Sequence, residues 1–266
     1  MCSLAAAGSV VTRWSVNRSV APARCLQAER PFSLPALSLA DVTDGRKTEC
    51  SFCYCRFMAT PTRPAPDSPG SGSRGQGRSE ARERLLSTAS ALFYREGIRA
   101  VGVERILAEA PATRATFYRH FPSKEDLVLA YLRGVDVHIR ADVQTAIETA
   151  PSPADAVRAI GTIVADDLAR PEFRGCAFLK AAAEYPDPHD PVRQVVLDHR
   201  GWYVTTLTEL FTQVFGTSPR RGKPEHAAQH FVMMRDGVMT GADLDGVDSV
   251  GAAFHRGVEG LLTLLR

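Results

Sequence analysis

The chain has 266 residues, of which 44% are hydrophobic and 23% are charged, and its formal net charge at pH 7 is +2. This composition is ordinary for a globular protein with one sizeable core or two modest ones. No apolar run reaches the roughly 18–20 residues that a transmembrane helix requires, so the sequence predicts no membrane span.

Charge is unevenly distributed along the chain. Residues 1–77 carry nine Lys/Arg against five Asp/Glu, residues 78–133 carry ten against seven, and residues 134–266 carry thirteen against eighteen. A basic front and an acidic back suit a protein whose N-terminal part meets a polyanion. The excess in each segment is small, so this pattern alone only favours such a partner.

The six cysteines are concentrated near the N-terminus, since five lie in the first 55 residues and the sixth is Cys176. This excludes a disulfide framework for the body of the chain, which we expect to be reduced and cytoplasmic. Cys50, Cys53 and Cys55 have a spacing that can hold a soft metal, but residues 1–119 contain no histidine to complete a zinc site. We therefore predict neither a metal nor a cofactor.

Residues 1–78 are predicted to be a disordered leader followed by a linker. Residues 1–57 show no sustained helical or strand period, and residues 60–79 are mostly Pro, Gly, Ser and Arg. Met58 stands just before this linker. One hypothesis is that translation starts at Met58, and the intact mass of the protein from its native host tests it.

From residue 79 onward the sequence predicts helices and no convincing strand. The first helix carries a stripe that includes Leu85 and Leu92, and Gly97 is placed to cap its end. Two short helices follow, at 103–110 and 113–120, with a break at the segment PAT between them. This arrangement predicts an N-terminal three-helix bundle.

Six further helices are predicted C-terminal to the bundle. Their ranges are 123–149, 154–169, 176–184, 190–215, 225–242 and 249–265. Ser123 opens the first of them with a capping box, in which Asp126 can bond back to the cap amide. Asp190 caps the long fourth one, with Pro191 as its first helical residue. The expected fold class is all-α, with a boundary between residues 79–125 and a larger helical domain at 126–266.

The short helix at 113–120 carries the candidate DNA-binding residues. Two short helices joined by a tight turn inside a three-helix bundle describe a helix-turn-helix, whose second helix lies in the DNA major groove. Arginine can read guanine with two hydrogen bonds, a threonine methyl can contact thymine, and Tyr, His and Lys side chains can reach phosphates. The candidates are Thr113, Arg114, Ala115, Thr116, Tyr118, Arg119, His120 and Lys124.

Each of these residues also has a plain structural explanation. Arg114 and Arg119 fit a solvated surface, Tyr118 fits the edge of the bundle, and His120 fits a helix end. For a single residue the structural explanation is the commoner one. Their combination on the third of three helices favours DNA.

Residues 79–131 resemble the N-terminal domain of the TetR family of transcriptional regulators. The resemblance rests on GIRAVGVERILAEA followed by TRATFYRHFPSKEDLVLAYL. The positions that match the family's Tyr-x-His-Phe element and its flanks are Thr113, Tyr118, His120, Phe121 and Lys124. The helical remainder of the chain agrees with the family in helix count and length.

Two positions depart from the family pattern. Pro111 stands in the turn between the second and third helices, where the family usually has glycine. Proline fixes φ at about −65° and disfavours a helical conformation at Ala110. Gly102 replaces the Ser or Thr that commonly starts the second helix, which removes a cap and a phosphate contact. We therefore expect a re-formed turn and a slightly re-aimed recognition helix.

The resemblance implies a C-terminal domain that dimerises and holds a small-molecule effector of unknown identity. The helices at 190–215 and 225–242 are long and apolar enough to pair with their copies in a homodimer. Such a dimer presents two recognition helices roughly 34–36 Å apart to a pseudo-palindrome in double-stranded DNA, and an effector that spreads them lowers the affinity. The candidate pocket residues are Phe178, His199, Trp202, Tyr203, Met233 and Met234, although such stripes are more often core.

The expected function is therefore a sequence-specific transcriptional regulator, with repression as the commoner outcome in the family. An enzyme is not expected, because the chain lacks a Gly-rich phosphate loop and the Gly-x-Ser-x-Gly and His-Glu-x-x-His motifs. The acidic loop with Glu184, Asp187, His189 and Asp190 is a possible metal group, but caps are the commoner role there. The alternative is a helical protein-interaction or small-molecule-binding module without DNA binding.

Overall fold

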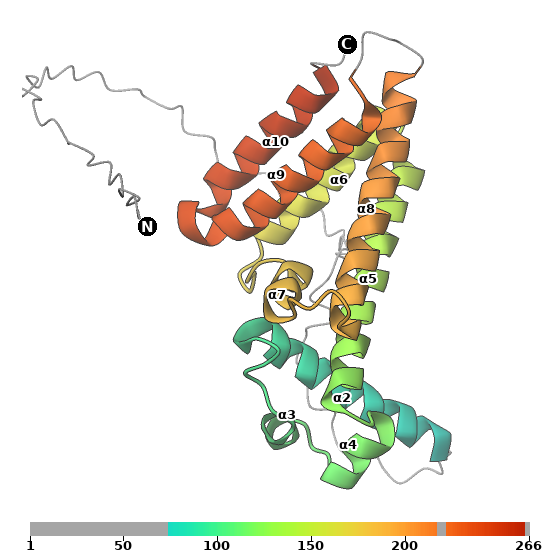
Figure 1. The fold of residues 1–266 in the computed structure, drawn as a ribbon, viewed down its shortest axis with the longest axis vertical. Coiled ribbons are helices and arrows are strands. Elements are labelled where there is room, and N and C mark those ends of the chain that lie inside the picture. Colours follow the sequence, from blue (N-terminus) through green and yellow to red (C-terminus); the bar gives the residue numbers. More distant parts are fainter. Residues whose placement is uncertain (1–73, 217–221, 264–266) are drawn as a thin grey trace, which may run out of the picture. The chain divides into compact units, whose positions relative to one another are not determined.

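A computed structural model of the chain describes residues 74–216 and 222–263, which form helices α2 to α10 (Figure 1). No strand occurs in these two stretches, and the expected all-α fold class is confirmed. The predicted leader before Arg74, with Cys50, Cys53, Cys55 and Met58, lies outside the described residues.

The N-terminal bundle consists of α2 (Arg74–Glu96), α3 (Val103–Glu109) and α4 (Arg114–His120). α2 packs against α3, against α4 and against α5 (Lys124–Thr149). Gly97 ends α2 as predicted. Its φ of +95° is left-handed, and its amide donates a hydrogen bond of 3.1 Å back into the last turn of the helix.

The start of α2 differs from the sequence prediction. The helix begins at Arg74, whereas the composition of the linker predicted a start at Ser79. The last proline before the helix is Pro69, so every backbone amide from Arg74 onward is available for helical hydrogen bonds. The two glycines in this first segment lower helix propensity without preventing a helix.

An apolar core holds the bundle together. Its buried side chains include Leu85, Leu92, Phe93, Ile98, Ile106, Phe117, Phe121 and Leu127. The rings of Phe93 on α2 and Tyr131 on α5 lie 5.8 Å apart, and both side chains are almost fully buried. Each buried side chain of this size stabilises the fold by about 1.5–3 kcal/mol, so the position of α4 is fixed mainly from its inner face.

The turn between α3 and α4 is built around Pro111, and Ala110 is not helical, as the proline predicted. Ala110 is extended, with φ −84° and ψ 126°, and the Ala112 amide donates to the Ala110 carbonyl at 2.6 Å. This closes a three-residue turn around Pro111, whose fixed φ suits the central position. Gly102 precedes α3 without a side-chain cap, also as expected.

The C-terminal helices pack around one another beyond the bundle. They are α6 (Pro153–Leu168), α7 (Ala177–Glu184), α8 (Pro191–Phe215), α9 (Pro224–Asp245) and α10 (Val247–Thr263). α8 packs against α5, α6 and α9, whereas α10 packs against α6 and α9. Asp190 caps α8 as predicted, by accepting a hydrogen bond from the Val192 amide at 2.8 Å.

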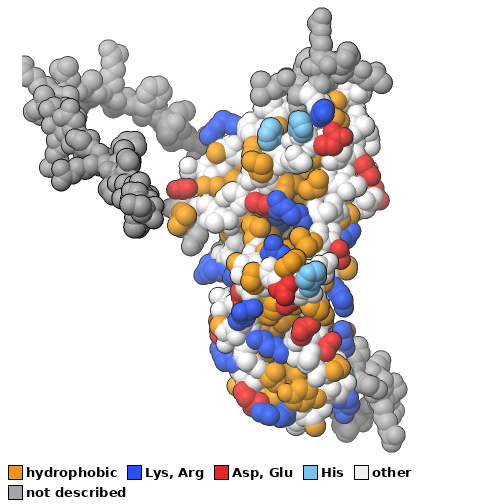
Figure 2. Space-filling view, in the orientation of Figure 1, with side chains coloured by type: hydrophobic (Ala, Val, Ile, Leu, Met, Phe, Trp, Pro, Cys, Tyr) orange, Lys and Arg blue, Asp and Glu red, His pale blue; other side chains and the backbone are white. Residues whose placement is uncertain are grey.

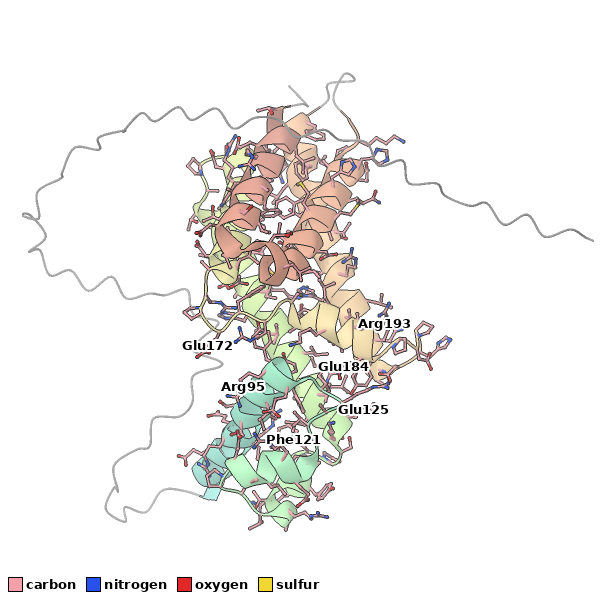
Figure 3. All side chains as sticks on the ribbon, turned by 90° about the vertical axis from the view of Figure 1, so that its left-hand side faces the viewer. Arg95, Phe121, Glu125, Glu172, Glu184 and Arg193 are labelled. Atoms are coloured by element: carbon pink, nitrogen blue, oxygen red, sulfur yellow. The ribbon has the colours of Figure 1, made fainter. Side chains whose placement is uncertain are left out.

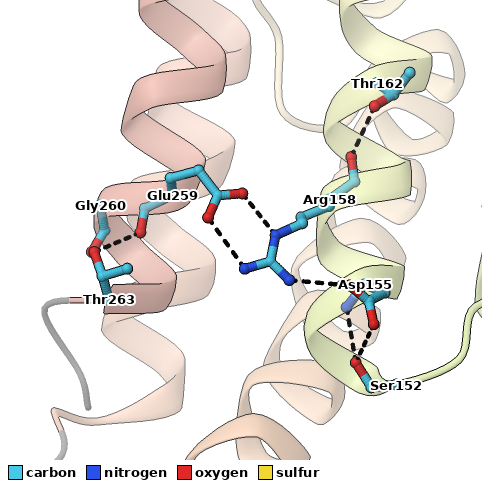
Figure 4. Close-up of polar contacts among 7 residues, drawn as sticks. All are labelled: Ser152, Asp155, Arg158, Thr162, Glu259, Gly260 and Thr263. Atoms are coloured by element: carbon cyan, nitrogen blue, oxygen red, sulfur yellow. Dashed lines mark hydrogen bonds and ion pairs between the residues drawn. The ribbon is translucent and has the colours of Figure 1, made fainter.

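An ion pair ties α6 to α10 (Figure 4). Arg158 donates to both carboxylate oxygens of Glu259, at 2.6 and 3.1 Å, and to Asp155 at 3.0 Å. Ser152 caps α6 by accepting from the Asp155 amide at 3.2 Å. Because the partners are partly exposed, these contacts fix the register of two helices more than they stabilise the fold.

Candidate functional site

The third helix of the bundle, α4, begins with an effective N-cap. The Thr113 hydroxyl accepts a hydrogen bond from the Thr116 amide at 3.1 Å, and the two threonine hydroxyl oxygens lie 3.0 Å apart. This cap satisfies one of the free amides of the first turn and fixes the residues that follow it. It also occupies the Thr116 hydroxyl and leaves the methyl group for other contacts.

α4 has one buried and one exposed face. Phe117 is buried, and the ring of Tyr118 packs edge-on against it at 5.2 Å while remaining 47% exposed. The exposed residues are Arg114, Ala115, Tyr118 and Arg119, and Thr116 and His120 are half-buried. On the face shown in Figure 2, Lys and Arg side chains surround this part of the chain, with Asp and Glu side chains between them.

Arg114 is paired with an acidic residue of the neighbouring helix. Its guanidinium contacts the carboxylate of Glu104 on α3, and both side chains are more than 60% exposed. An ion pair with this exposure contributes little to stability and opens at low cost. The geometry therefore holds Arg114 over the α3–α4 turn without preventing it from reaching a ligand.

Lys124, expected at a phosphate, has partners within the chain. Its ammonium donates to the Ile98 carbonyl at 2.6 Å and lies 5.9 Å from the ring centre of Phe93. Burial lowers the pKa of this lysine, and Glu184 opposes the shift. Lys124 thus fixes the loop between α2 and α3, and its contact with DNA stays a prediction.

The capping box at the start of α5 is present in an altered form. Ser123 accepts from the Asp126 amide at 3.0 Å, as predicted. The Asp126 carboxylate accepts from the Ser123 hydroxyl at 2.7 Å, whereas the sequence predicted a bond to the cap amide. An aspartate is one methylene shorter than the glutamate of the usual motif, so the nearer hydroxyl is the easier donor to reach.

The end of α2 is attached to α7. The carboxylate of Glu184 accepts hydrogen bonds from the Ile98 amide at 2.9 Å and the Arg99 amide at 2.5 Å. Lys180 donates to the Tyr94 carbonyl at 2.5 Å, and burial lowers the pKa of its ammonium. Figure 3 shows Glu184 where α7 meets the bundle. We call these residues the α7 clamp.

Tyr94 extends the α7 clamp to the segment before α7. Its hydroxyl donates to the Gly175 carbonyl at 3.0 Å and accepts from the Arg174 amide at 2.9 Å. Burial raises the pKa of this phenol, so it stays protonated at neutral pH. These partners could not be predicted from the sequence, because they are 80 to 86 residues apart in the chain and no local pattern relates them.

Three of the candidate pocket residues meet in an aromatic cluster with a histidine. Phe178 on α7 stacks on His199 of α8, with ring centres 3.8 Å apart and 4° between the ring planes. Trp202 and Tyr203 lie 5.7 and 6.2 Å from the His199 ring. The structure therefore brings together four of the six residues that the sequence singled out.

His199 is held by a carboxylate that the sequence analysis did not single out. Its Nδ1 lies 2.7 Å from Asp136 Oδ1 on α5. Burial lowers the pKa of His199 to about 4, although the hydrogen bond that His199 donates to Asp136 raises it. The imidazole is therefore neutral at pH 7.

A buried arginine, also missed, borders the cluster. Arg235 on α9 is only 7% exposed, donates to Asp236 at 3.1 Å and to the Cys176 sulfur at 3.5 Å, and lies over the ring of Tyr203. Cys176 directly precedes α7, so this contact joins α9 to the start of that helix. The signal in the sequence was that Arg235 is the single Lys or Arg of α9.

The prediction for Met233 is wrong. This side chain is 64% exposed on the outer face of α9 and does not line a site within the chain. Met234 is half-buried and packs on Gly257 of α10, where an added Cβ would lie 2.5 Å from the methionine sulfur. Apolar residues at helical spacing show which side of a helix they share, but they do not show which neighbouring helix covers that side. Met233 and Met234 lie on a side of α9 that does not face the aromatic cluster.

The acidic residues of the loop before α8 have local hydrogen-bond partners. Glu184 binds loop amides, Asp187 accepts from the His189 amide at 2.9 Å, and Asp190 caps α8. No group of three or more candidate metal ligands occurs in residues 74–216 and 222–263. Within the same residues, none of the helices combines the length and apolarity that crossing a membrane requires.

Comparison with known proteins places this geometry in a family. The family model for bacterial regulatory proteins of the tetR family matches residues 85–131, which span α3, α4 and parts of α2 and α5. The HTH-type transcriptional regulator LmrA of Bacillus subtilis is 25% identical over 146 residues, covering 54% of this chain and 77% of its own. These relatives are regulators and not enzymes.

Solved structures extend the similarity to the C-terminal domain. A TetR regulator from Chloroflexus aurantiacus has the same fold, with a TM-score of 0.64, 22% identity and coverage of 71% of this chain and 97% of its own. SCO4454, a TetR-family transcriptional regulator from Streptomyces coelicolor, is 49% identical, with a TM-score of 0.67 and coverage of 70% and 96%. Since this identity extends over nearly all of that regulator, the chain belongs to the TetR family and is a DNA-binding transcriptional regulator.

Proposed function

We propose that the chain acts in the cytoplasm as a homodimeric repressor, which binds a pseudo-palindromic operator through α4 and is released by a small-molecule effector. Residues 79–125 are then the DNA-binding domain, and residues 126–266 bind the effector and dimerise. The observation that carries the proposal is the exposed face of α4, which places Arg114, Ala115, Tyr118 and Arg119 outward on a helix whose other face is buried.

The roles on α4 follow from position and chemistry. Arg114 and Ala115 are the first exposed residues after the Thr113 cap, which is the part of a recognition helix that meets base edges. Tyr118 and Arg119 lie one turn later, where hydroxyl and guanidinium groups reach phosphates. The half-buried His120 is then at the margin of the interface.

DNA binding is tested by titrating salt against a duplex taken from upstream of the chain's own gene. For a protein that neutralises several phosphates, log affinity falls linearly with log salt. We expect Arg114→Ala to lose about 1–3 kcal/mol of discrimination at one base pair, and Tyr118→Ala to weaken binding to all sequences alike.

Arg133→Ala is the matched control for Arg114→Ala. It removes the same charge from an exposed position on α5, away from α4. It should leave base preference unchanged. If Arg114→Ala and Tyr118→Ala bind like the unmodified chain, α4 is not the recognition helix and the alternative of a module without DNA binding gains support.

The dimer interface is proposed on α9 and α10. The residues His226, His230, Met233, Gly237, Thr240 and Leu244 follow one another at spacings of three and four and are all exposed. Met233 and Leu244 are 64% and 80% exposed, which is unusual for side chains of this type. Such a stripe is the seam of a helix that packs on a copy. The outward residues of α10 include Ala252 and Ala253, which permit close approach.

In this interface α10 takes the place of α8, which the sequence predicted as a partner of α9. The sequence predicted α8 and α9, but the exposed side of α8 is mostly polar, with Gln194, Asp198 and Glu209, and only Leu197 is an exposed large hydrophobic residue. Met233→Glu should convert dimer to monomer in analytical ultracentrifugation. Val137→Glu, at an apolar α5 residue that is 67% exposed, is the control and should leave the dimer intact.

The α7 clamp supports a route from effector to DNA. One end of α7 carries Phe178, stacked on His199 inside the C-terminal domain, and the other carries Glu184, bonded to the loop after α2. The eight residues of α7 form about two helical turns and span about 12 Å, so this short rigid helix transmits a shift at one end to the other. An effector that moves Phe178 therefore moves the bundle that holds α4.

A further inference from the structure

A buried polar atom without a hydrogen-bond partner lies inside the aromatic cluster. His199 is 3% exposed, and its Nε2 is buried with no hydrogen-bond partner among the described residues. Buried polar side-chain atoms in proteins almost always have a partner in the chain, in water or in a ligand. Nε2 of His199 is therefore a buried position that a group from outside the chain can satisfy.

Asp136 decides which kind of group this is. Its carboxylate can only accept, so Nδ1 of His199, 2.7 Å away, carries the proton of the neutral imidazole. The lone pair is then on Nε2, which is an acceptor. Burial and the nearby Arg235 both disfavour a second proton on the ring, since His199 has a pKa of about 4. A partner for Nε2 must therefore donate a hydrogen bond.

The surroundings favour an aromatic, uncharged partner. Phe178, Trp202 and Tyr203 lie against the His199 ring, at ring-centre distances of 3.8, 5.7 and 6.2 Å. Aromatic side chains favour stacked or edge-on contacts with another ring.

The charges near the cluster already have partners. Arg140 lies over Trp202 and is bonded to Asp136 at 2.8 Å, and Arg235 is bonded to Asp236. A charged ligand here would give up its hydration without gaining an unpaired counter-charge. A neutral ligand avoids this cost.

We propose that the effector is a neutral molecule with an aromatic ring and a hydroxyl or N–H group that donates a hydrogen bond to His199 Nε2. This rests on the proposed function, in which the C-terminal domain binds an effector. The ring of such a ligand contacts Phe178 and so acts on α7, the helix whose far end holds the DNA-binding bundle.

The test uses matched aromatic probes against the full chain. Phenol and 2-naphthol carry the donor, anisole and 2-methoxynaphthalene have the same rings with an acceptor only, and 2-naphthoate is the anion. Dissociation constants are measured by isothermal titration calorimetry. Phenol or 2-naphthol should bind about tenfold more tightly than its methoxy counterpart, the difference expected for one hydrogen bond to a buried acceptor.

Variants assign the preference to His199. His199→Phe keeps a ring in the stack and removes the acceptor, so the hydroxyl and methoxy probes should bind equally. In Asp136→Asn the residue at 136 no longer fixes the proton on His199 Nδ1, so the preference for hydroxyl over methoxy probes should fall. This variant keeps the test available if His199→Phe does not fold. Leu197→Ala, at an exposed α8 residue, is the control and should keep the full preference.

Three results would overturn the proposal: no binding of phenol or 2-naphthol, equal binding of hydroxyl and methoxy probes to the unmodified chain, or tightest binding of 2-naphthoate. DNA affinity of the same preparation is measured without any probe. If DNA is bound and the probes are not discriminated, the ligand class is wrong and the regulator function stands. If DNA is not bound, the proposed function fails independently.

Discussion

The DNA-binding bundle and the C-terminal domain use their polar residues in opposite ways. On α4 the side chains of Arg114, Tyr118 and Arg119 are exposed around a buried Phe117, so they can contact a large polar partner. In the C-terminal domain His199 and Arg235 are buried among aromatic rings, where each polar contact is strong and each missing one is costly. Side chains of an exposed interface can stay mobile until the partner binds, whereas the polar groups of a buried site need their hydrogen bonds in the folded chain.

The largest effect should come from breaking the buried side of α4. Phe117→Ala removes a fully buried ring and should lower the free energy of unfolding by about 3–5 kcal/mol, with loss of DNA binding. Tyr118→Ala, one residue along and 47% exposed, should lower DNA affinity with little change in stability. Chemical denaturation and binding assays on both variants separate the two faces. Equal stability losses would show that the faces are not distinct.

The effect of burying His199 in the C-terminal domain can be tested by varying the pH. The folded pKa of His199, about 4, is below its unfolded value of about 6.5, so the folded state binds fewer protons in this range. The stabilising effect is complete above the unfolded pKa and is lost as the pH falls towards 4. Lowering the pH from 7 to 5 should therefore lower the free energy of unfolding by about 2 kcal/mol through this group.

The control for this pH dependence is His199→Phe, in which that part of the slope should disappear. His226→Phe, at an exposed α9 residue, should keep the slope of the unmodified chain. Urea denaturation at several pH values makes the comparison. A slope unchanged by His199→Phe would place the titration in another group.

Weakening the α7 clamp tests whether the two regions are coupled. Lys180→Met with Glu184→Leu removes the hydrogen bonds to the Tyr94 carbonyl and to the Ile98 and Arg99 amides, and it leaves the core intact. Without these contacts the bundle is held less firmly, so an operator with one base pair inserted between its half-sites should lose less affinity than it does with the unmodified chain. We expect the penalty for the insertion to fall by about tenfold, or about 1.4 kcal/mol.

Fluorescence anisotropy with both operators measures this penalty. Arg158→Met with Glu259→Gln removes an ion pair of similar geometry between α6 and α10 and serves as the control. It should leave the spacing penalty unchanged. The same penalty in the clamp variant and the unmodified chain would mean that α7 does not orient the bundle.

The smallest effect concerns the cap of α4. Thr113→Ala removes the hydroxyl that accepts from the Thr116 amide and should cost about 1 kcal/mol of stability. Thr113→Ser keeps the hydroxyl and should be close to the unmodified chain. Thermal unfolding by circular dichroism measures both. A serine variant as unstable as the alanine variant would assign the effect to the methyl group.

The sequence by itself determined the helices and the kind of site at the N-terminal end. Apart from the start of α2, the helix bounds followed closely from apolar periodicity and from caps such as Thr113 and Asp190. A capping hydroxyl or carboxylate acts on amides only two or three residues away. The exposed set on α4 was predictable for the same reason, since one helical turn relates all its members. The proline turn at Pro111 was also local.

Only the tertiary structure decided which distant groups meet. Asp136 beside His199, Glu184 beside Ile98 and Arg235 beside Cys176 are 63, 86 and 59 residues apart. The outward position of Met233, and the engagement of Lys124 with a loop carbonyl, depend equally on neighbouring helices. Helical periodicity assigns a residue to a side of its helix, but the packing of all the helices determines what that side contacts.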